Sequence, residues 1–223
     1  MIKRIAFVLG ALLLAAVVPV QADSISIFST GVAAGGGLAA NATVDAHYTL
    51  TSAADGVFNG PAAFVAITPG VYPFTDWMPG TSNARWIGPR SSLAYPFATG
   101  NYVYTTTFDL SGLNPSTAIL TGGWATDNSG VDILLNGVSL GISIPNGSHT
   151  ALVPFTISSG FVPGVNTLQF VVYNDVAATG LLVDINGTAN PLSSAQRINP
   201  VPEPGTLLLV GSGLVGAWLR RRS

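Results

Sequence analysis

Hydrophobic and polar residues alternate with a period of two along much of this chain, which is the pattern of a β-strand with one buried face. In the clearest case, Tyr102, Tyr104 and Phe108 fall on one side of the strand and Thr105 falls on the other. This alternation, together with short apolar runs, predicts strands over residues 24–30, 44–51, 62–68, 102–108, 117–125, 131–135, 152–157, 168–173 and 181–185. Helical periodicity is hard to find between them.

Turn signals separate these runs at short intervals. Asn-Gly pairs begin at Asn59, Asn136, Asn146 and Asn186, and such pairs supply the positive φ angles that tight turns need. Many short strands with regular turns predict an all-β fold, an antiparallel β-sandwich or jelly roll. Residues 31–42 are rich in Gly and Ala, so we expect a loop there.

The N-terminal residues form a different pattern. Lys3 and Arg4 precede an apolar run over residues 5–18, and Pro19 ends that run before the small residue Ala22. These are the parts of a secretory signal peptide, which we expect to span residues 1–22. The sequence therefore predicts an exported domain over residues 23–190, followed by a polar linker over residues 191–200.

The C-terminal residues 201–223 contain a second sorting pattern. Pro202, Glu203 and Pro204 are followed by an apolar run over residues 206–219 and then by Arg220, Arg221 and Arg222. As a helix, a run of about 14 residues is roughly 21 Å long, which is shorter than the roughly 30 Å hydrocarbon core of a bilayer. The length favours transient membrane residence, and an ordinary tail anchor is the alternative.

These C-terminal residues resemble the PEP-CTERM sorting signal of bacterial proteins. The resemblance implies an exosortase-type processing enzyme as a partner and a transient stay in the inner membrane, with the body in the periplasm. It also implies final delivery to the cell surface or extracellular matrix. The resemblance covers about a tenth of the chain and says where the protein goes, without saying what it does.

Charge and cysteine content exclude several functions for the body. Between the two signals, three arginines face nine aspartates, so the formal net charge is −6. A nucleic-acid binder needs clustered lysine and arginine to neutralise phosphates, and this composition excludes that function. The chain has no cysteine, so disulfides and cysteine-type zinc sites are excluded as well.

A second resemblance concerns the body. The segments 101–110, 123–128, 131–137, 164–174 and 180–187 read NYVYTTTFDL, GWATDN, VDILLNG, GVNTLQFVVYN and GLLVDING. In this order they look like the galactose-binding-like jelly roll, a module also found as the sugar-binding domain beside glycoside hydrolase barrels. The resemblance covers residues 102–189 most clearly. It implies the fold, and it implies a ligand only loosely.

Catalytic patterns are scarce. His47 and His149 are the only histidines, and neither lies beside a G-x-S-x-G nucleophile motif. Glycoside hydrolysis needs two opposed carboxylates, and no motif selects a pair among the nine aspartates. We therefore expect a protein that is not an enzyme, with an unrecognised glycan hydrolase as an open alternative.

Sugar binding needs an aromatic plate surrounded by hydrogen-bonding groups. Trp77, Arg85, Trp86 and Arg90 lie together in the Pro- and Gly-rich stretch 73–96 and form the main candidate. The alternative is that loop tryptophans cover the core. Trp124 lies within a predicted strand, so we expect it in the core.

Four further residues are candidate ligand contacts. His47 is two residues from Asp45 on a predicted strand, and the two either bind a hydroxyl or pair with each other. Asp127 and Asn128 form a turn between strands or offer oxygens to a sugar or calcium, and Asn174 has the same two interpretations. We expect no cofactor. A structural calcium ion is an alternative, although no D-x-D-x-D-G loop is present.

Together these observations predict an exported, non-catalytic protein that associates with extracellular polysaccharide or envelope glycans. The alternatives are a structural or adhesive matrix component without a specific ligand and the unrecognised hydrolase. The expected partners are the exosortase-type enzyme, the extracellular polysaccharide and, in transit, the inner membrane.

Overall fold

The computed structural model describes residues 21–56, 60–67, 70 and 72–192. The sorting motif (Pro202, Glu203, Pro204, Arg220, Arg221 and Arg222), Asn59 and almost all of the predicted signal peptide lie outside these residues. The described part is built from antiparallel strands and one short 3₁₀ helix, Pro115–Thr117. Within it, no helix is long and apolar enough to cross a membrane.

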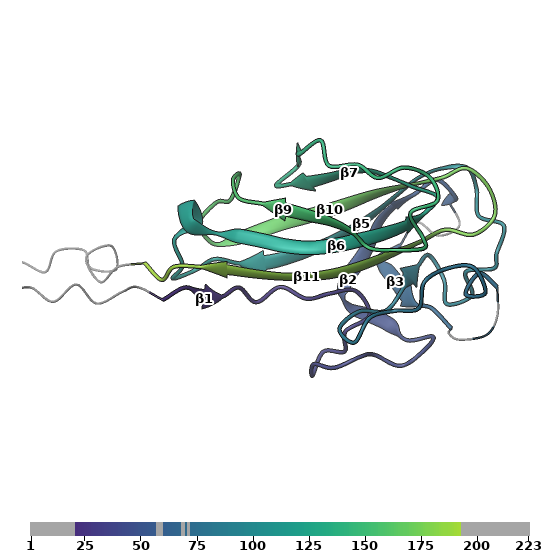
Figure 1. Cartoon of the computed structure of the whole chain (residues 1–223), viewed down its shortest axis with the longest axis horizontal. Coiled ribbons are helices and arrows are strands. Elements are labelled where there is room, and N and C mark those ends of the chain that lie inside the picture. Colours follow the sequence, from purple (N-terminus) through teal and green to yellow (C-terminus); the bar gives the residue numbers. More distant parts are fainter. Residues whose placement is uncertain (1–20, 57–59, 68–69, 71, 193–223) are drawn as a thin grey trace, which may run out of the picture.

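The strands are β1 (Asp23–Ser24), β2 (Val44–Ala53), β3 (Ala62–Val65), β4 (Ile87–Gly88), β5 (Gly100–Asp109), β6 (Ile119–Asp127), β7 (Ser129–Leu135), β8 (Val138–Ser139), β9 (Val153–Ile157), β10 (Val165–Asn174) and β11 (Gly180–Ala189). They pair in the order β8-β7-β10-β5-β2-β3-β4-β11-β6-β9, with β1 added beside β11. Every pair is antiparallel. The curled sheet forms two layers, with β6, β9 and β11 in one and β2, β5, β7 and β10 in the other (Figure 1). The predicted all-β, antiparallel β-sandwich is confirmed.

The main hydrophobic core fills the space between the layers. Trp124 on β6 and Phe170 on β10 have ring centroids 5.7 Å apart, and Phe155 on β9 lies 6.1 Å from Phe170. Tyr48 on β2 meets the same ring at 6.3 Å. Trp124 has no exposed surface, as the sequence predicts. The aromatic side chains therefore join strands of both layers.

A second, smaller core lies on the outer face of the β6–β11 layer. Leu181 and Val183 of β11 point into the main core, whereas Leu182 between them belongs to the second cluster. Ala125, which pairs with Leu182 across the sheet, belongs to it too. The long segment between β3 and β5 covers this face with Ala66, Trp77, Ala84, Trp86 and Leu93.

Several predicted elements differ in detail from the structure. The prediction of a turn at Asn186-Gly187 is wrong, because both residues lie inside β11. A Cβ on Gly187 would overlap the Leu120 side chain, so this glycine permits close packing. Of the predicted strand over residues 24–30, only Ser24 lies in a strand. The residues after it are joined to the sheet by isolated hydrogen bonds, such as that from the Thr30 N–H to the Val183 carbonyl. The short strands β4 and β8 are not foreseen by the sequence patterns.

The two ends of the sandwich differ in composition. At one end, Asp23 of β1 pairs with Ala189 of β11, so the described chain enters and leaves there (Figure 1). At the other end, Gly180 of β11 pairs with Asp127 of β6, and Asn174 of β10 pairs with Gly100 of β5. We call this second end, formed by residues 72–78, 127–129, 145–150 and 174–179, the loop end.

Candidate functional site

The structure separates the eight candidate ligand residues into distinct places. Trp77, Asp127, Asn128 and Asn174 belong to the loop end, and Trp86 packs beside Trp77. His47 and Arg85 lie near the loop of residues 31–42, whereas Arg90 stacks on Tyr95, with its guanidinium carbon 4.6 Å from the ring centroid. The sequence cluster Trp77, Arg85, Trp86 and Arg90 therefore does not form a single site.

The two loop tryptophans lie in the second core. Trp86 has no exposed surface, and its indole N–H donates to the Met78 carbonyl at 2.9 Å. Trp77 is 5% exposed, and the two rings are 4.4 Å apart at 39°. A sugar ring cannot stack on the face of Trp86 in this arrangement. Both residues lie where the alternative interpretation, that loop tryptophans cover the core, would place them.

Asp127 is the most perturbed acid of the loop end. Its side chain accepts a hydrogen bond from Trp77, and its Oδ1 lies 3.8 Å from His149 Nδ1. Burial raises the pKa of Asp127 to about 7, with a smaller upward contribution from the Asp175 charge, against the downward effect of the Trp77 bond. Trp77 and His149 also face each other at 6.2 Å. Asp127 thus links the 72–78 segment to β6.

Asn128 and Asn174 use most of their hydrogen-bonding groups internally. Asn128 Oδ1 accepts from the Asp175 N–H at 2.8 Å, and Asn128 donates its own N–H to the Tyr173 carbonyl at 3.1 Å. Asn174 is fully buried and donates to the carbonyls of Phe97 and Ala98 at 3.0 and 3.2 Å. Both side chains therefore bond neighbouring segments to one another, Asn128 between β6 and β7 and Asn174 as the last residue of β10.

Two of the candidate calcium ligands of this region are already engaged by the protein. Asp127 is engaged by Trp77, and Asn128 Oδ1 is engaged by the Asp175 backbone. In the part of the chain that the structure describes, no group of three or more His, Cys, Asp or Glu side chains is placed to hold a metal.

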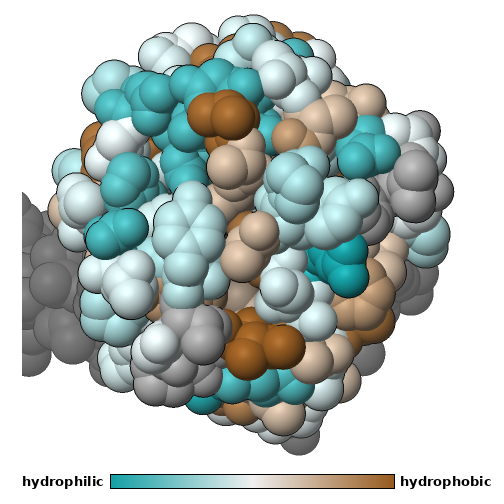
Figure 2. Space-filling view, turned by 90° about the vertical axis from the view of Figure 1, so that its right-hand side faces the viewer, coloured by the Kyte–Doolittle hydropathy of each residue, from teal (hydrophilic) through white to brown (hydrophobic). Residues whose placement is uncertain are grey.

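The surface of the loop end is mixed in polarity. Tyr72 is 48% exposed and Val176 is 68% exposed. Figure 2 views this end directly and shows hydrophobic side chains scattered among hydrophilic ones. Asp175 and Asn146 join two of its loops through a 3.0 Å hydrogen bond between their side chains.

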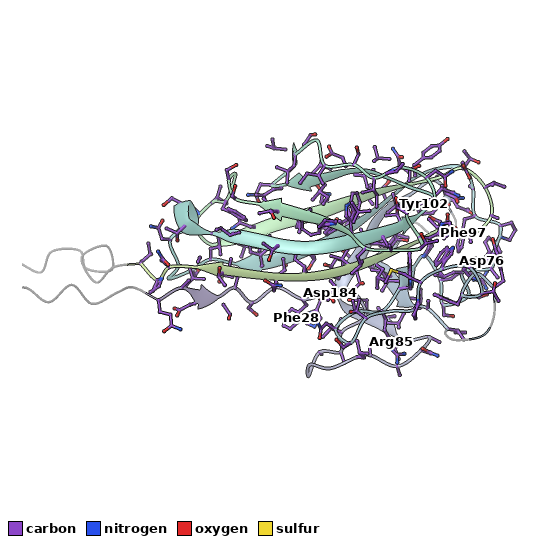
Figure 3. The ribbon with its side chains drawn as sticks, viewed as in Figure 1. Phe28, Asp76, Arg85, Phe97, Tyr102 and Asp184 are labelled. Carbon is purple, nitrogen blue, oxygen red and sulfur yellow. The ribbon has the colours of Figure 1, made fainter. Side chains whose placement is uncertain are left out.

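A pocket of about 320 Å³ lies beside β11, between residues 27–29 and the loops of residues 32–38 and 82–83. Its lining includes Phe28, Leu38, Ser82, Asn83 and Ile185, and we call it the Phe28 pocket. Gly36 and Gly37 complete one wall, and no atom lies within 4 Å of where their Cβ atoms would be. Figure 3 shows Phe28 and Asp184 near each other on this side of β11. The pocket combines one aromatic ring with neutral polar groups.

Two hydrogen-bond systems, one partly buried around Asp184 and one buried around Asp45, position the pocket walls. Asp184 on β11 accepts from the Thr81 hydroxyl at 2.7 Å and from the Ser29 hydroxyl at 3.4 Å. Thr81 Oγ1 in turn accepts from the Asn83 N–H at 3.0 Å. The carboxylate of Asp184 thereby fixes the turn that carries Ser82 and Asn83.

Asp45 positions the opposite wall. Its carboxylate accepts from the backbone N–H groups of Gly31, His47 and Tyr48 at 2.5, 2.7 and 2.8 Å. Burial raises the Asp45 pKa, and these bonds oppose that rise. The His47 ring stacks on Phe28 at 3.7 Å and 10°. Asp45 therefore bonds the His47 backbone, while the ring of His47 supports Phe28.

Arg85 reinforces the base of the same loop. Its guanidinium donates to Asn41 Oδ1 at 2.7 Å, and its backbone N–H donates to the Thr30 carbonyl at 2.8 Å. A Cβ on Gly31, which has φ +70°, would overlap the Arg85 side chain. Two residues selected from the sequence, His47 and Arg85, therefore support the pocket walls. Phe28 and Asn83, which line the pocket, were not among the residues selected from the sequence. Their signal was weak, because neither belongs to a motif.

Comparison with known proteins identifies one motif. The PEP-CTERM protein-sorting motif matches residues 200–223, which confirms that prediction. The motif indicates an exported protein that an exosortase sorts to the cell surface. No curated protein matches the chain in sequence.

Three solved carbohydrate-binding modules show limited similarity to the chain. One is the CBM36-1 domain of a multidomain xylanase from the hindgut metagenome of Trinervitermes trinervoides, with 17% identity over 42% of this chain and 74% of that chain, at a TM-score of 0.30. CBM35 from Paenibacillus barcinonensis has 19% identity over 62% and 93%, at a TM-score of 0.32. The family 11 module from Clostridium thermocellum, in complex with a β-1,3-1,4-mixed-linked tetrasaccharide, has 12% identity over 66% and 97%, at 0.32. At such TM-scores these likenesses carry no information about the ligand.

Proposed function

We propose that this exported, exosortase-sorted protein binds a neutral segment of extracellular polysaccharide in the Phe28 pocket, without catalysis. The observation that carries the proposal is the combination in one pocket of an aromatic ring, Phe28, with the neutral polar side chains Ser82 and Asn83. We retain the sugar-binding role predicted from the sequence and propose the Phe28 pocket as its site, in place of the buried tryptophans.

The chemistry of the pocket suits a sugar ring. The apolar C–H face of a pyranose packs on an aromatic or aliphatic surface, here Phe28 and Leu38. Its hydroxyls both donate and accept hydrogen bonds, which a carboxamide and a hydroxyl can match. A volume of about 320 Å³ lies at the lower end of the range of roughly 300–1,000 Å³ for ligand sites, which favours one or two sugar units of a longer chain.

The hydrogen bonds of Asp184, which positions the pocket wall, support the non-catalytic assignment. Both oxygens of Asp184 accept side-chain hydroxyls of the protein, those of Ser29 and Thr81. Glycoside hydrolysis needs a second carboxylate opposite the first across the sugar. The described residues that line the pocket include no acid, so they supply neither the general acid nor its partner.

Affinity electrophoresis of the purified domain through gels containing single polysaccharides, including that of the producing cells, tests the proposal. We expect retardation by at least one neutral polysaccharide and its loss in Phe28→Ala and Asn83→Ala. Asn83 is exposed, so its replacement leaves the core unchanged and separates binding from folding. Tyr72→Ala at the loop end is the matched control, because Tyr72 is an exposed aromatic outside the pocket.

Each outcome has a clear meaning. No retardation of the unmodified domain by any polysaccharide refutes glycan binding and favours a structural or adhesive matrix role. Loss of binding in Tyr72→Ala with retention in Phe28→Ala and Asn83→Ala places the site at the loop end, where Asp127 and Asn128 lie.

A further inference from the structure

The outer face of the layer formed by β2, β5, β7 and β10 carries several threonines. Along β5, Tyr102, Tyr104, Thr106 and Phe108 are buried on the inner side, so Val103, Thr105 and Thr107 between them point outward. Eight of the outward side chains of β2, β5 and β10 form what we call the threonine face: Thr49, Thr51, Val103, Thr105, Thr107, Thr167, Gln169 and Val171. The same strands also expose, around this set, Ser52, Asn101, Asp109, Val165 and Tyr173.

Strand register places these side chains in rows. Thr49 pairs with Thr105, and Thr105 pairs with Gln169, which makes one row across three strands. Thr107 pairs with Thr167 in the next row, and Val103 pairs with Val171 on the other side. With strands about 4.8 Å apart and same-face residues roughly 6.7 Å apart along a strand, the rows cover roughly 10 Å by 15 Å.

The hydroxyls at the centre of the face are held in place. Thr51 Oγ1 and Thr105 Oγ1 are 2.7 Å apart, and Gln169 Nε2 lies 3.5 Å from Thr105 Oγ1. Thr49 Oγ1 also donates to the Thr105 carbonyl at 3.3 Å. Threonine has few χ1 rotamers, so this array loses little side-chain entropy when a partner binds.

The threonine face carries no charge, although the exported body has a net charge of −6. Asp45 on β2 is buried, and Asp109 is the last residue of β5. β10 contains no charged residue. On the neighbouring strand β7, Asp132 is engaged by the Ser139 hydroxyl and the Ile142 N–H. The eight side chains of the threonine face therefore offer no counter-charge to a charged polymer, and Asp109, exposed at the end of β5, lies beyond them.

The residue types of the threonine face, which does not include the exposed Tyr173 near the end of β10, also argue against a protein partner. Protein interfaces draw their binding energy from Trp, Tyr and Arg, whereas Ser, Thr and Val are under-represented at such positions. Threonine instead offers methyl and hydroxyl groups side by side, which matches the alternating C–H and O–H groups of a neutral sugar surface. Each contact is weak, so useful affinity needs many contacts made at once.

We propose that the threonine face of β2, β5 and β10 adsorbs a neutral polysaccharide whose chains lie packed side by side, as in an insoluble fibre or particle. This proposal goes beyond the pocket: the pocket takes one or two sugar units, whereas the face takes several adjacent chains. The two sites are on different layers and act independently.

Pull-down with washed particles of cellulose, chitin and β-1,3-glucan tests the face. The double variant Thr107→Lys/Thr167→Lys places two charges on it, and we expect a roughly tenfold or greater loss of particle binding because a charge at a dry contact is left unpaired. Thr156→Lys, at an exposed position of β9 in the other layer, is the matched control and should bind as the unmodified protein does. Thr51→Val keeps the shape, removes one hydroxyl and should give a smaller loss.

The results distinguish failure of the face from failure of the pocket. Particle binding that the double variant retains, or that Phe28→Ala abolishes, overturns the proposed role of the face. Absence of particle binding overturns it too, and leaves the pocket proposal standing if soluble polysaccharide still retards the domain. If the double variant is thermally less stable than the unmodified protein, Thr51→Val becomes the test of the threonine face. Unchanged particle binding by Thr51→Val would then overturn the proposed role of the face.

Discussion

Replacing Asp127 with asparagine should stabilise the protein at neutral pH. Asp127 is 7% exposed, and burial raises its pKa from 3.8 to about 7. Between these values the folded protein holds a proton that the unfolded chain has lost. The free energy of unfolding therefore falls as the pH rises from about 4 to about 7 and stays low above that. At 1.36 kcal/mol per pKa unit, the full loss is roughly 4 kcal/mol.

Asparagine is a close test of this reasoning. Its amide oxygen can still accept the Trp77 N–H, and it carries no charge to bury. We expect Asp127→Asn to be about 2–4 kcal/mol more stable than the unmodified protein at pH 8, with the difference shrinking towards zero at pH 4.

Urea unfolding followed by tryptophan fluorescence at a series of pH values measures this directly. Asp76→Asn is the control, because Asp76 is an exposed acid near the same end of the sandwich (Figure 3). A difference for Asp127→Asn that does not change with pH would refute the argument. A loss of stability at pH 8 would show instead that His149, 3.8 Å away, makes the ionised carboxylate favourable.

Further predictions concern the second core, the loop of residues 31–42, the pocket and catalysis. Trp86→Ala should lower the free energy of unfolding in urea by about 3–5 kcal/mol, since the ring is fully buried; a change below about 1 kcal/mol would contradict its core role. Gly31→Ala should cost about 1–3 kcal/mol in the same assay, because a Cβ there meets Arg85. Asp184→Ala frees the turn held through Thr81 and should weaken retardation by polysaccharide, and unchanged retardation would remove it from the site. The purified domain should release no reducing sugar, and measurable release would restore the hydrolase alternative.

The sequence predicted strands well where side chains alternate strictly between buried and exposed positions. The β5 and β10 patterns are of this kind, because each strand has the core on one side and solvent on the other. β11 is harder, since Leu181 and Leu182 are both buried, one in each core. Its Asn186-Gly187 pair shows that a turn motif can instead satisfy packing inside a strand.

The candidate site was predictable only in part. Trp77 and Trp86 stand out in composition, but their burial depends on the outer face of β11 being hydrophobic at Leu182. That requirement appears only when the strand order is known. The Phe28 pocket joins residues near positions 28, 37, 83 and 185, which no local motif connects. His47 and Arg85 were selected for ligand contact and instead support its walls.

The position of β11, beside β6 and at the C-terminal end of the domain, has a mechanical consequence. After β11 the described chain stays on the domain for three residues, because residues 190–192 bond to residues 112–114. Once these contacts open, a pull along the strand axis loads the nine β11–β6 residue pairs together, in shear, so the bonds do not open one after another. Ile185 of the same strand lines the Phe28 pocket, so tension between the tail and a glycan bound as we propose would follow β11. The strand with two buried faces is thus the tension-bearing element of the molecule.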